Sequence, residues 1–190
     1  MHSVRYLACV VTTALLTCSG AATSIAASAE STALKGHSGA DNGLIAIGSD
    51  PIPFQLQDLD GDTVSLSDFK GKKAVLLAFW SFFCGPCREE IPLLDEITKK
   101  HAPQDLEMLA INLDGPKLEK AVQKYVSAGN FSFRVVWEEI EGVQYKTADA
   151  YGVAGTPSVV LIDKRGKVSW THVGREEGPT IEKEIQKALK

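Results

Sequence analysis

The sequence predicts an α/β protein with a mixed central sheet and helices on both faces of that sheet. The stretch from Ala74 to Phe79 is apolar without interruption, which is typical of a strand buried on both sides. Strand and helix patterns alternate after it, which implies parallel strands joined by right-handed crossovers. The last two predicted strands are separated only by a turn at residues 163–166, so we expect them to be antiparallel.

The composition indicates one domain and gives no sign of a nucleic-acid partner. The chain has 190 residues, with 20 Lys and Arg against 24 Asp and Glu and a net charge of −4. About 150 residues remain after the N-terminal region, which is enough for one domain with a full core. Charges of both signs are mixed along the chain, and no basic patch or stripe is present.

Residues 1–29 have the features of an export signal. Residues 7–16 are an apolar core too short to span a bilayer, and Ala27-Ser28-Ala29 fits a small-residue cleavage site. Two alternatives to a cleaved signal stay open. Cys18 could carry a lipid anchor, because the residues before it resemble the motif that precedes the lipidated cysteine of bacterial lipoproteins. The segment could also stay uncleaved as a membrane anchor. Residues 30–50 are rich in Ser, Ala and Gly and predict a flexible linker before a domain at 51–190.

An N-terminal β-hairpin is expected ahead of the main sheet. Apolar residues alternate with polar ones around Leu56 and again around Val64, and Asp60-Gly61 between them signals a turn. A short helical turn at residues 67–71 should follow, closed by a glycine.

Two cysteines lie where the buried strand gives way to a helix, whose apolar face carries Ile91, Leu94 and Ile97. Cys84 should lie at the helix N-terminus, where free N–H groups and the helix dipole lower a thiol pKa from about 8.5 toward roughly 7 or below. Cys87 lies one turn deeper and should be shielded. An acidified thiol that attacks, with a buried thiol that resolves the mixed disulfide, is what disulfide exchange requires.

A zinc site is a poor explanation of this pair, so we expect no metal. Zinc needs two more ligands, and the body of the chain has no second Cys pair and no His pair. Only Cys84 and Cys87 remain once the signal is removed, so no disulfide framework exists. One dithiol at a helix start in an exported protein indicates redox chemistry outside the cytoplasm.

The rest of the chain continues the alternation. Strands are expected at residues 106–113, 131–137, 158–162 and 167–173. Helices are expected after residue 116, at 143–151 and from 178 to the C-terminus, with His101 ending the redox helix without a catalytic role. The acidic residues 138–142 are interpreted as a solvated edge, because they lack the ordered spacing of metal ligands.

Taken together, these features resemble the thioredoxin superfamily, and more narrowly the exported TlpA/ResA-like thiol–disulfide oxidoreductases. The resemblance covers roughly residues 51–190. It rests on three motifs, FQLQDLDGDTVSL at 54–66, FWSFFCGPCREEIP at 79–92 and YGVAGTPS at 151–158. The N-terminal hairpin and an inserted βα-type segment at 131–151 fit this branch better than plain thioredoxin.

The resemblance implies a redox-active Cys84–Cys87 disulfide facing a cis peptide before Pro157. It also implies that the backbone of Thr156 pairs with an extended target peptide. The remaining active-site surround would comprise Trp80, Phe83, Gly85 and Pro86, although core packing explains Trp80 equally well.

One departure concerns the buried acid–lysine pair of thioredoxin, whose positions correspond to Ala78 and Ala110 here. Both partners are absent, so no lone buried charge is left. A proton acceptor for Cys87 is missing as a result, and Glu89 or Glu90 acting through water is a candidate replacement.

The sequence-based hypothesis is a disulfide reductase without a cofactor. Its targets would be envelope proteins such as apocytochrome c, and its electrons would come from a membrane thiol-transferring donor. Two alternatives stay open. The first is a peroxiredoxin-like peroxidase, although this chain has Ser81 where that family usually has Thr, three residues before the reactive cysteine. The second is a non-catalytic module that would bind metal or haem through the two thiols.

Overall fold

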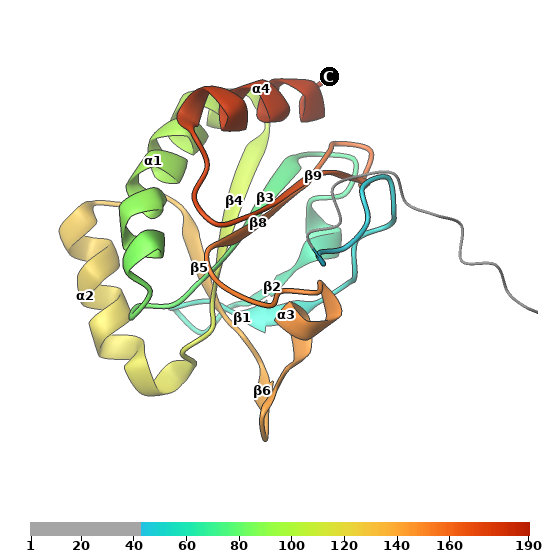
Figure 1. The fold of residues 1–190 in the computed structure, drawn as a ribbon. Helices are drawn as coiled ribbons and strands as arrows, with labels where there is room; N and C mark the ends of the chain where they lie inside the picture. The colour runs from blue at the N-terminus through green and yellow to red at the C-terminus, as the bar shows by residue number, and fades with distance from the viewer. Residues whose placement is uncertain (1–42) are drawn as a thin grey trace, which may run out of the picture. The chain divides into compact units, whose positions relative to one another are not determined.

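The computed structural model describes residues 43–190, which are coloured in Figure 1. The predicted export signal, the lipidation site at Cys18 and the linker up to residue 42 lie outside the described residues. Within residues 43–190, no helix is both long and apolar enough to cross a membrane.

The core of the fold is a five-stranded mixed sheet in the order β5-β4-β3-β8-β9. The strands are β3 Ala74–Trp80, β4 Leu106–Asn112, β5 Arg134–Trp137, β8 Ser158–Ile162 and β9 Val168–Val173. β3, β4 and β5 are parallel, whereas β8 is antiparallel to β3 and β9 to β8. The predicted mixed sheet with its antiparallel final pair is confirmed.

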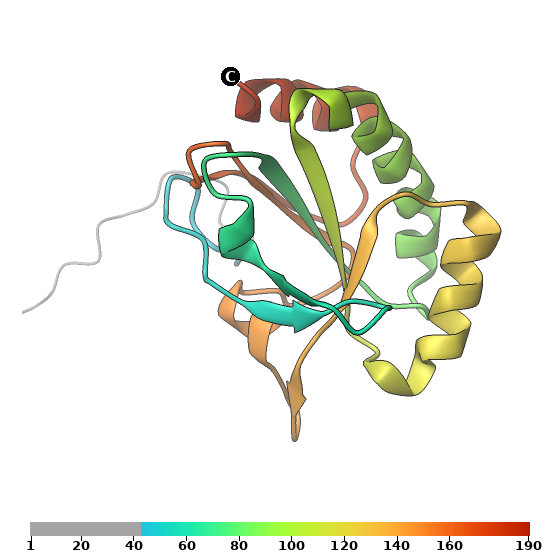
Figure 2. The same ribbon diagram turned by 180° about the vertical axis from the view of Figure 1, so that it is seen from behind.

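Helices cover both faces of this sheet (Figures 1 and 2). The α-helices are α1 Gly85–His101, α2 Glu119–Gly129, α3 Lys146–Ala150 and α4 Gly178–Ala188. Short 3₁₀ turns lie at Leu66–Asp68, Ala102–Gln104 and Pro116–Leu118.

Strand β3 separates two hydrophobic clusters because successive side chains point to opposite faces. Leu76 and Trp80 join α1, α2 and α4 in one cluster. Leu77 and Phe79 join the N-terminal hairpin and α3 in the other. Every residue of β3 is buried, which explains why its sequence has no polar alternation.

The N-terminal hairpin consists of β1 Gln55–Gln57 and β2 Thr63–Ser65, with Leu56 opposite Val64. The described chain already pairs with the domain before Pro51. Ile45 N–H donates to the Tyr151 carbonyl, and Gly48 N–H donates to the Val168 carbonyl. The packed part of the chain therefore begins earlier than residue 51.

The inserted segment between β5 and β8 differs in detail from the prediction. Residues expected to begin a helix at 143 instead form a two-stranded hairpin of β6 Ile140–Glu141 and β7 Gln144–Tyr145, and α3 starts only at Lys146. Gly142 has φ +64°, a conformation favoured by glycine at the first turn residue of a two-residue hairpin, so residues 142–143 form a turn and the helix starts only after β7.

The interpretation of the acidic residues as a solvated edge is wrong for Glu138, which is 2% exposed. Its carboxylate accepts the backbone N–H groups of Glu139, Thr147 and Ala148 at 2.7–2.9 Å. Two of these donors lie in the first turn of α3, so this carboxylate stabilises the start of the helix.

Candidate functional site

The site begins where β3 ends, because the carboxyl end of β3 leads through residues 81–84, the redox loop, into α1. Cys84 is the N-cap residue of α1, with extended backbone angles, and Pro86 lies in the first turn. The Cys87 N–H donates to Cys84 Sγ at 3.2 Å. A sulfur at this position accepts an otherwise unpaired N–H group of the helix start.

Cys84 and Cys87 are joined by a disulfide, with their Cα atoms 5.3 Å apart. Their exposures differ: Cys84 is partly exposed, whereas Cys87 is completely buried among the residues of the first cluster. In the reduced form the outer sulfur would meet an incoming disulfide first, and the inner sulfur would be shielded from solvent.

The loop before β8 lies against the outer sulfur. The Thr156–Pro157 peptide is cis, as the resemblance implied. The carbonyl oxygen of Thr156 lies 3.5 Å from Cys84 Sγ. Gly174 N–H donates to the Pro157 carbonyl at 2.8 Å, which ties this loop to the end of β9.

Asp114, at the carboxyl end of β4, holds the redox loop in place, a function that the sequence analysis missed. Its carboxylate accepts Ser81 Oγ–H and Phe82 N–H, each at 2.6 Å, and Asn112 Nδ2–H at 3.1 Å. Asp114 lies more than 30 residues from Ser81 in the chain, so only the parallel pairing of β3 with β4 indicated that their ends meet.

The other residues predicted to surround the dithiol differ in their exposure to solvent. Phe83 is 75% exposed directly before Cys84, and Gly85 and Pro86 are also exposed. Trp80 is buried and packs against Tyr125 with ring centroids 5.7 Å apart. The structure therefore brings Phe83 to the surface beside the sulfur and places the Trp80 ring in the core.

Glu90 lies one helical turn after Cys87 and is 2% exposed. Its Oε1 accepts the Glu176 N–H at 2.9 Å, and its Oε2 has no hydrogen-bond partner within residues 43–190. Burial raises the pKa of this carboxyl group, against the lowering effects of the Glu176 N–H, His172 and Arg175. Of the two glutamates considered as proton acceptors, Glu90 is buried on the helix that carries Cys87, whereas Glu89 is exposed and pairs with Arg175.

The strand positions of the missing acid–lysine pair hold buried apolar side chains. Ala78 and Ala110 lie opposite each other in the register of β3 and β4, and both are buried in the first cluster. Within the described part of the chain, no group of three or more His, Cys, Asp or Glu side chains is arranged to hold a metal ion.

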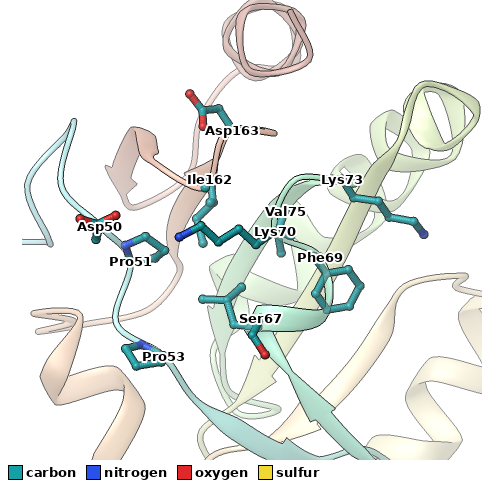
Figure 3. A pocket seen from close by; sticks show the side chains of 12 residues that line it. Asp50, Pro51, Pro53, Ser67, Phe69, Lys70, Lys73, Val75, Ile162 and Asp163 are labelled. Carbon is teal, nitrogen blue, oxygen red and sulfur yellow. The ribbon is translucent and has the colours of Figure 1, made fainter.

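A separate apolar cavity of about 270 Å³ lies at the opposite end of β3, between Val75, Ile162 and Phe69. Figure 3 shows the Lys70 side chain extending across it toward Asp50. Since Val75 is near the start of β3 and the cysteines follow its end, this cavity is not part of the dithiol site.

Comparisons with known proteins agree with this geometry. The Redoxin family model matches residues 48–189. A thiol–disulfide oxidoreductase ResA of Halalkalibacterium halodurans is 33% identical over 135 residues, which cover 71% of this chain and 73% of that protein. ResA of Geobacillus thermodenitrificans is 38% identical over 124 residues, covering 65% and 67%.

Solved structures similar to this chain are also described as thiol–disulfide exchange proteins or thioredoxins. A protein described as a thiol:disulfide interchange protein DsbE of Chlorobium tepidum superposes with a TM-score of 0.68 at 31% identity, covering 77% of this chain and 99% of that one. The exposed lipoprotein thioredoxin Etrx1 of Streptococcus pneumoniae gives a TM-score of 0.59 at 31% identity, covering 72% and 99%.

Proposed function

The chain belongs to the Redoxin family as a TlpA/ResA-like thiol–disulfide oxidoreductase of the thioredoxin superfamily, and we propose that it reduces disulfides of cell-envelope proteins. Cys84 is the attacking sulfur in this proposal and Cys87 the resolving one. The observation that carries the proposal is the unequal exposure of the two sulfurs at a helix start, beside the backbone of Thr156.

The reaction consists of two exchanges. The Cys84 thiolate attacks one sulfur of the target disulfide, a mixed disulfide forms, and the other target sulfur leaves as a thiolate. Cys87, deprotonated, then attacks Cys84 Sγ. The Cys84–Cys87 disulfide forms, and the second target sulfur leaves. The target gains two electrons and two protons, and the protein becomes oxidised.

Several groups of this chain support these steps. The N-terminal end of α1 stabilises the Cys84 thiolate through its dipole and free N–H groups. Asp114 fixes the redox loop, so that the attacking sulfur is held beside Thr156. The buried carboxylate of Glu90 is the acceptor we propose for the proton of Cys87, by way of water.

The proposed direction of electron flow is supported by the dipeptide between the cysteines, Gly85-Pro86, which matches that of reducing thioredoxins. A reductase must itself be reduced, and a membrane protein that transfers thiol electrons would supply two electrons for each turnover. Disulfides of envelope proteins such as apocytochrome c are the proposed targets, as the resemblance to the TlpA/ResA-like oxidoreductases implies.

Export fits this chemistry. The predicted signal at residues 1–29 would place the domain where protein disulfides form. Cys18 is the proposed lipidation site if the protein is anchored, and Etrx1, one of the similar structures, is described as a lipoprotein. Labelling with a radioactive fatty acid, compared between the wild type and Cys18→Ser, would decide whether the protein is lipid-anchored at Cys18.

Reduction of insulin disulfides tests the activity. The wild type should reduce insulin with dithiothreitol as the electron source, and Cys84→Ser should lose this activity completely. Cys87→Ala should instead accumulate a mixed disulfide through Cys84, which mass spectrometry would locate. Retention of activity by Cys84→Ser would contradict the proposal.

The reduction potential tests the direction. Thioredoxin, a reductant, has a potential of about −270 mV, and the oxidant DsbA has about −120 mV. Equilibration with glutathione buffers should place this protein nearer to the first value. A potential close to the second would reverse the proposed direction and leave the exchange chemistry intact.

A further inference from the structure

The hairpin formed by residues 139–145, here called the arm, projects from the end of the sheet that carries the dithiol. It follows β5, whose carboxyl end lies beside those of β4 and β3. In Figures 1 and 2 the arm extends beyond the sheet at the end where α1 begins. Only two residues on each side pair, and Gly142 and Val143 form the turn between them.

The base of the arm is firmly attached to the domain. Lys146 N–H donates to the Glu139 carbonyl at 3.0 Å, and the Lys146 ammonium group pairs with Glu139 and Glu141 at 2.8 and 3.4 Å. Ile140 lies close to Gly115, since a Cβ atom on that glycine would be 3.3 Å from Ile140 Cδ1. The arm therefore has a defined position relative to the loop that follows Asp114.

The tip of the arm carries an apolar side chain that does not pack in the hydrophobic core. Val143 is 92% exposed, and a β-branched side chain is unusual in a turn, where Gly, Asn and Asp are favoured. Its exposure means that its side chain contributes almost nothing to the hydrophobic core. A single exposed apolar residue is common on protein surfaces, so Val143 carries weight only together with the other exposed apolar residues at this end of the domain.

Other exposed apolar side chains gather at the same end of the domain. Within residues 43–190 the large exposed hydrophobic residues are Ile47, Ile52, Phe83, Ile140, Val143 and Val173. Phe83 directly precedes Cys84, and Val173 pairs with Ser158 next to the cis proline. Four of the six therefore lie on the arm or beside the dithiol.

A cavity of about 300 Å³ lies between the base of the arm and the loop beside the attacking sulfur. Its lining includes residues 153–156, and the carbonyl of Thr156 lies 3.5 Å from Cys84 Sγ. Tyr145 of the arm and Asp114 also line it. A chain bound at Thr156 that continued through this cavity would reach the arm.

We propose that the arm is a docking element for the target polypeptide, which binds in an extended form with apolar residues flanking its disulfide. The flanking segment would run from Thr156 through the cavity and end against Tyr145, Ile140 and Val143. This inference rests on the proposed function and adds a preference for the sequence around the target cysteine. The arm has two exposed carboxylates, which share the ammonium group of Lys146 at its base, so it favours a neutral or basic segment over an acidic one.

The test compares single-turnover rates of the reduced protein with three disulfides. Two of them are peptides that each contain one disulfide. In the first peptide the disulfide is flanked on both sides by three apolar residues, Val or Leu, and in the second by three Ser residues. The third is the small aromatic disulfide 5,5′-dithiobis(2-nitrobenzoate), which cannot reach the arm. Val143→Asp and the uncharged variant Val143→Ser are measured, with Ile47→Asp and Ile47→Ser as matched controls, because Ile47 is an exposed apolar residue of the N-terminal segment.

The wild type should prefer the apolar-flanked peptide to the Ser-flanked one. Both Val143 variants should react with the apolar-flanked peptide about three- to tenfold more slowly, the size expected when a valine side chain that is only partly buried in the complex is removed. Their rates with the Ser-flanked peptide and with the small disulfide should be unchanged. The Ile47 variants should match the wild type throughout.

The inference is overturned if Val143→Ser and Val143→Asp reduce the apolar-flanked peptide at the wild-type rate. It is equally overturned if they slow all three disulfides alike, or if the Ile47 variants show the same loss. Failure of the proposed function looks different, because the wild-type protein would then reduce neither peptide, although its exposed thiol would still react with the small aromatic disulfide. Equal urea midpoints for all variants would show that the domain is folded in each case.

Discussion

Glu90 and Glu138 are both 2% exposed, and the difference between them lies in their hydrogen bonds. Glu138 accepts three backbone N–H groups, two of them from the start of α3. Glu90 accepts one, from Glu176, and its second oxygen has no partner in the described chain. Equal burial therefore leaves one carboxylate fully paired and the other only partly paired.

This difference in hydrogen bonding suits Glu138 to a structural role and Glu90 to proton transfer. A buried charge costs stability unless hydrogen bonds compensate for it, and Glu138 has that compensation. Glu90 has less of it, so burial raises the pKa of its carboxyl group. A partly paired carboxyl group on the helix of the resolving cysteine can exchange a proton, whereas Glu138 has all of its donors in place to fix α3.

The largest effect is expected for Glu138→Ala. Removing the carboxylate leaves three N–H groups, two of them buried, without an acceptor, which should lower the free energy of unfolding by about 2–4 kcal/mol. Urea unfolding followed by tryptophan fluorescence measures this loss. Glu139→Ala is the matched control, because Glu139 is exposed and its pair with Lys146 should contribute under about 1 kcal/mol. Equal losses in the two variants would contradict the structural role of Glu138.

Glu90→Gln should slow the resolving step at pH 7 by about tenfold or more, because it removes the proposed proton acceptor. A stopped-flow assay that starts from a preformed mixed disulfide at Cys84 isolates this step. The initial attack by Cys84, measured by alkylation, should change much less. Glu89→Gln serves as the control, since its carboxylate is exposed and pairs with Arg175. An unchanged resolving rate in Glu90→Gln would exclude this role.

Glu90 should also make stability depend on pH. Its pKa is raised on folding, so the folded state holds the proton more tightly than the unfolded state. The resulting stabilisation is present below the unfolded pKa of about 4.3 and is lost as the pH rises through the folded value. The stability of Glu90→Gln relative to the wild type should therefore increase between pH 4 and pH 8 in urea titrations. A constant difference would show that the Glu90 pKa is not raised.

The smallest effect is expected for Arg175→Ala. Arg175 pairs with Glu89 at 2.6 Å, but both side chains are more than half exposed. Exposed ion pairs contribute about 0.2–1 kcal/mol, so the urea midpoint should barely move. A loss comparable to that of Glu138→Ala would mean that this region depends on the pair as strongly as α3 depends on its buried carboxylate.

The sequence by itself determined the features that depend on neighbouring residues in the chain. An unbroken apolar run predicted β3, apolar residues at helical spacing predicted α1, and two cysteines at their junction predicted the dithiol. The N-terminal hairpin followed from alternation around an Asp-Gly turn. These patterns are local, because strand periodicity, helix periodicity and turn conformation are set over a few residues.

Only the tertiary structure decided which polar groups meet across the fold. Asp114 reaches the redox loop across 32 and 33 residues of sequence, and Glu90 meets Glu176 across 86. Glu138 stands in an acidic run that looks exposed, and it is buried because α3 folds back onto its carboxylate. The arm combines residues interpreted as a solvated acidic edge with residues 143–145, which we predicted as the start of a helix. Burial and hydrogen-bond partners depend on packing between distant segments, and local periodicity carries no information about that packing.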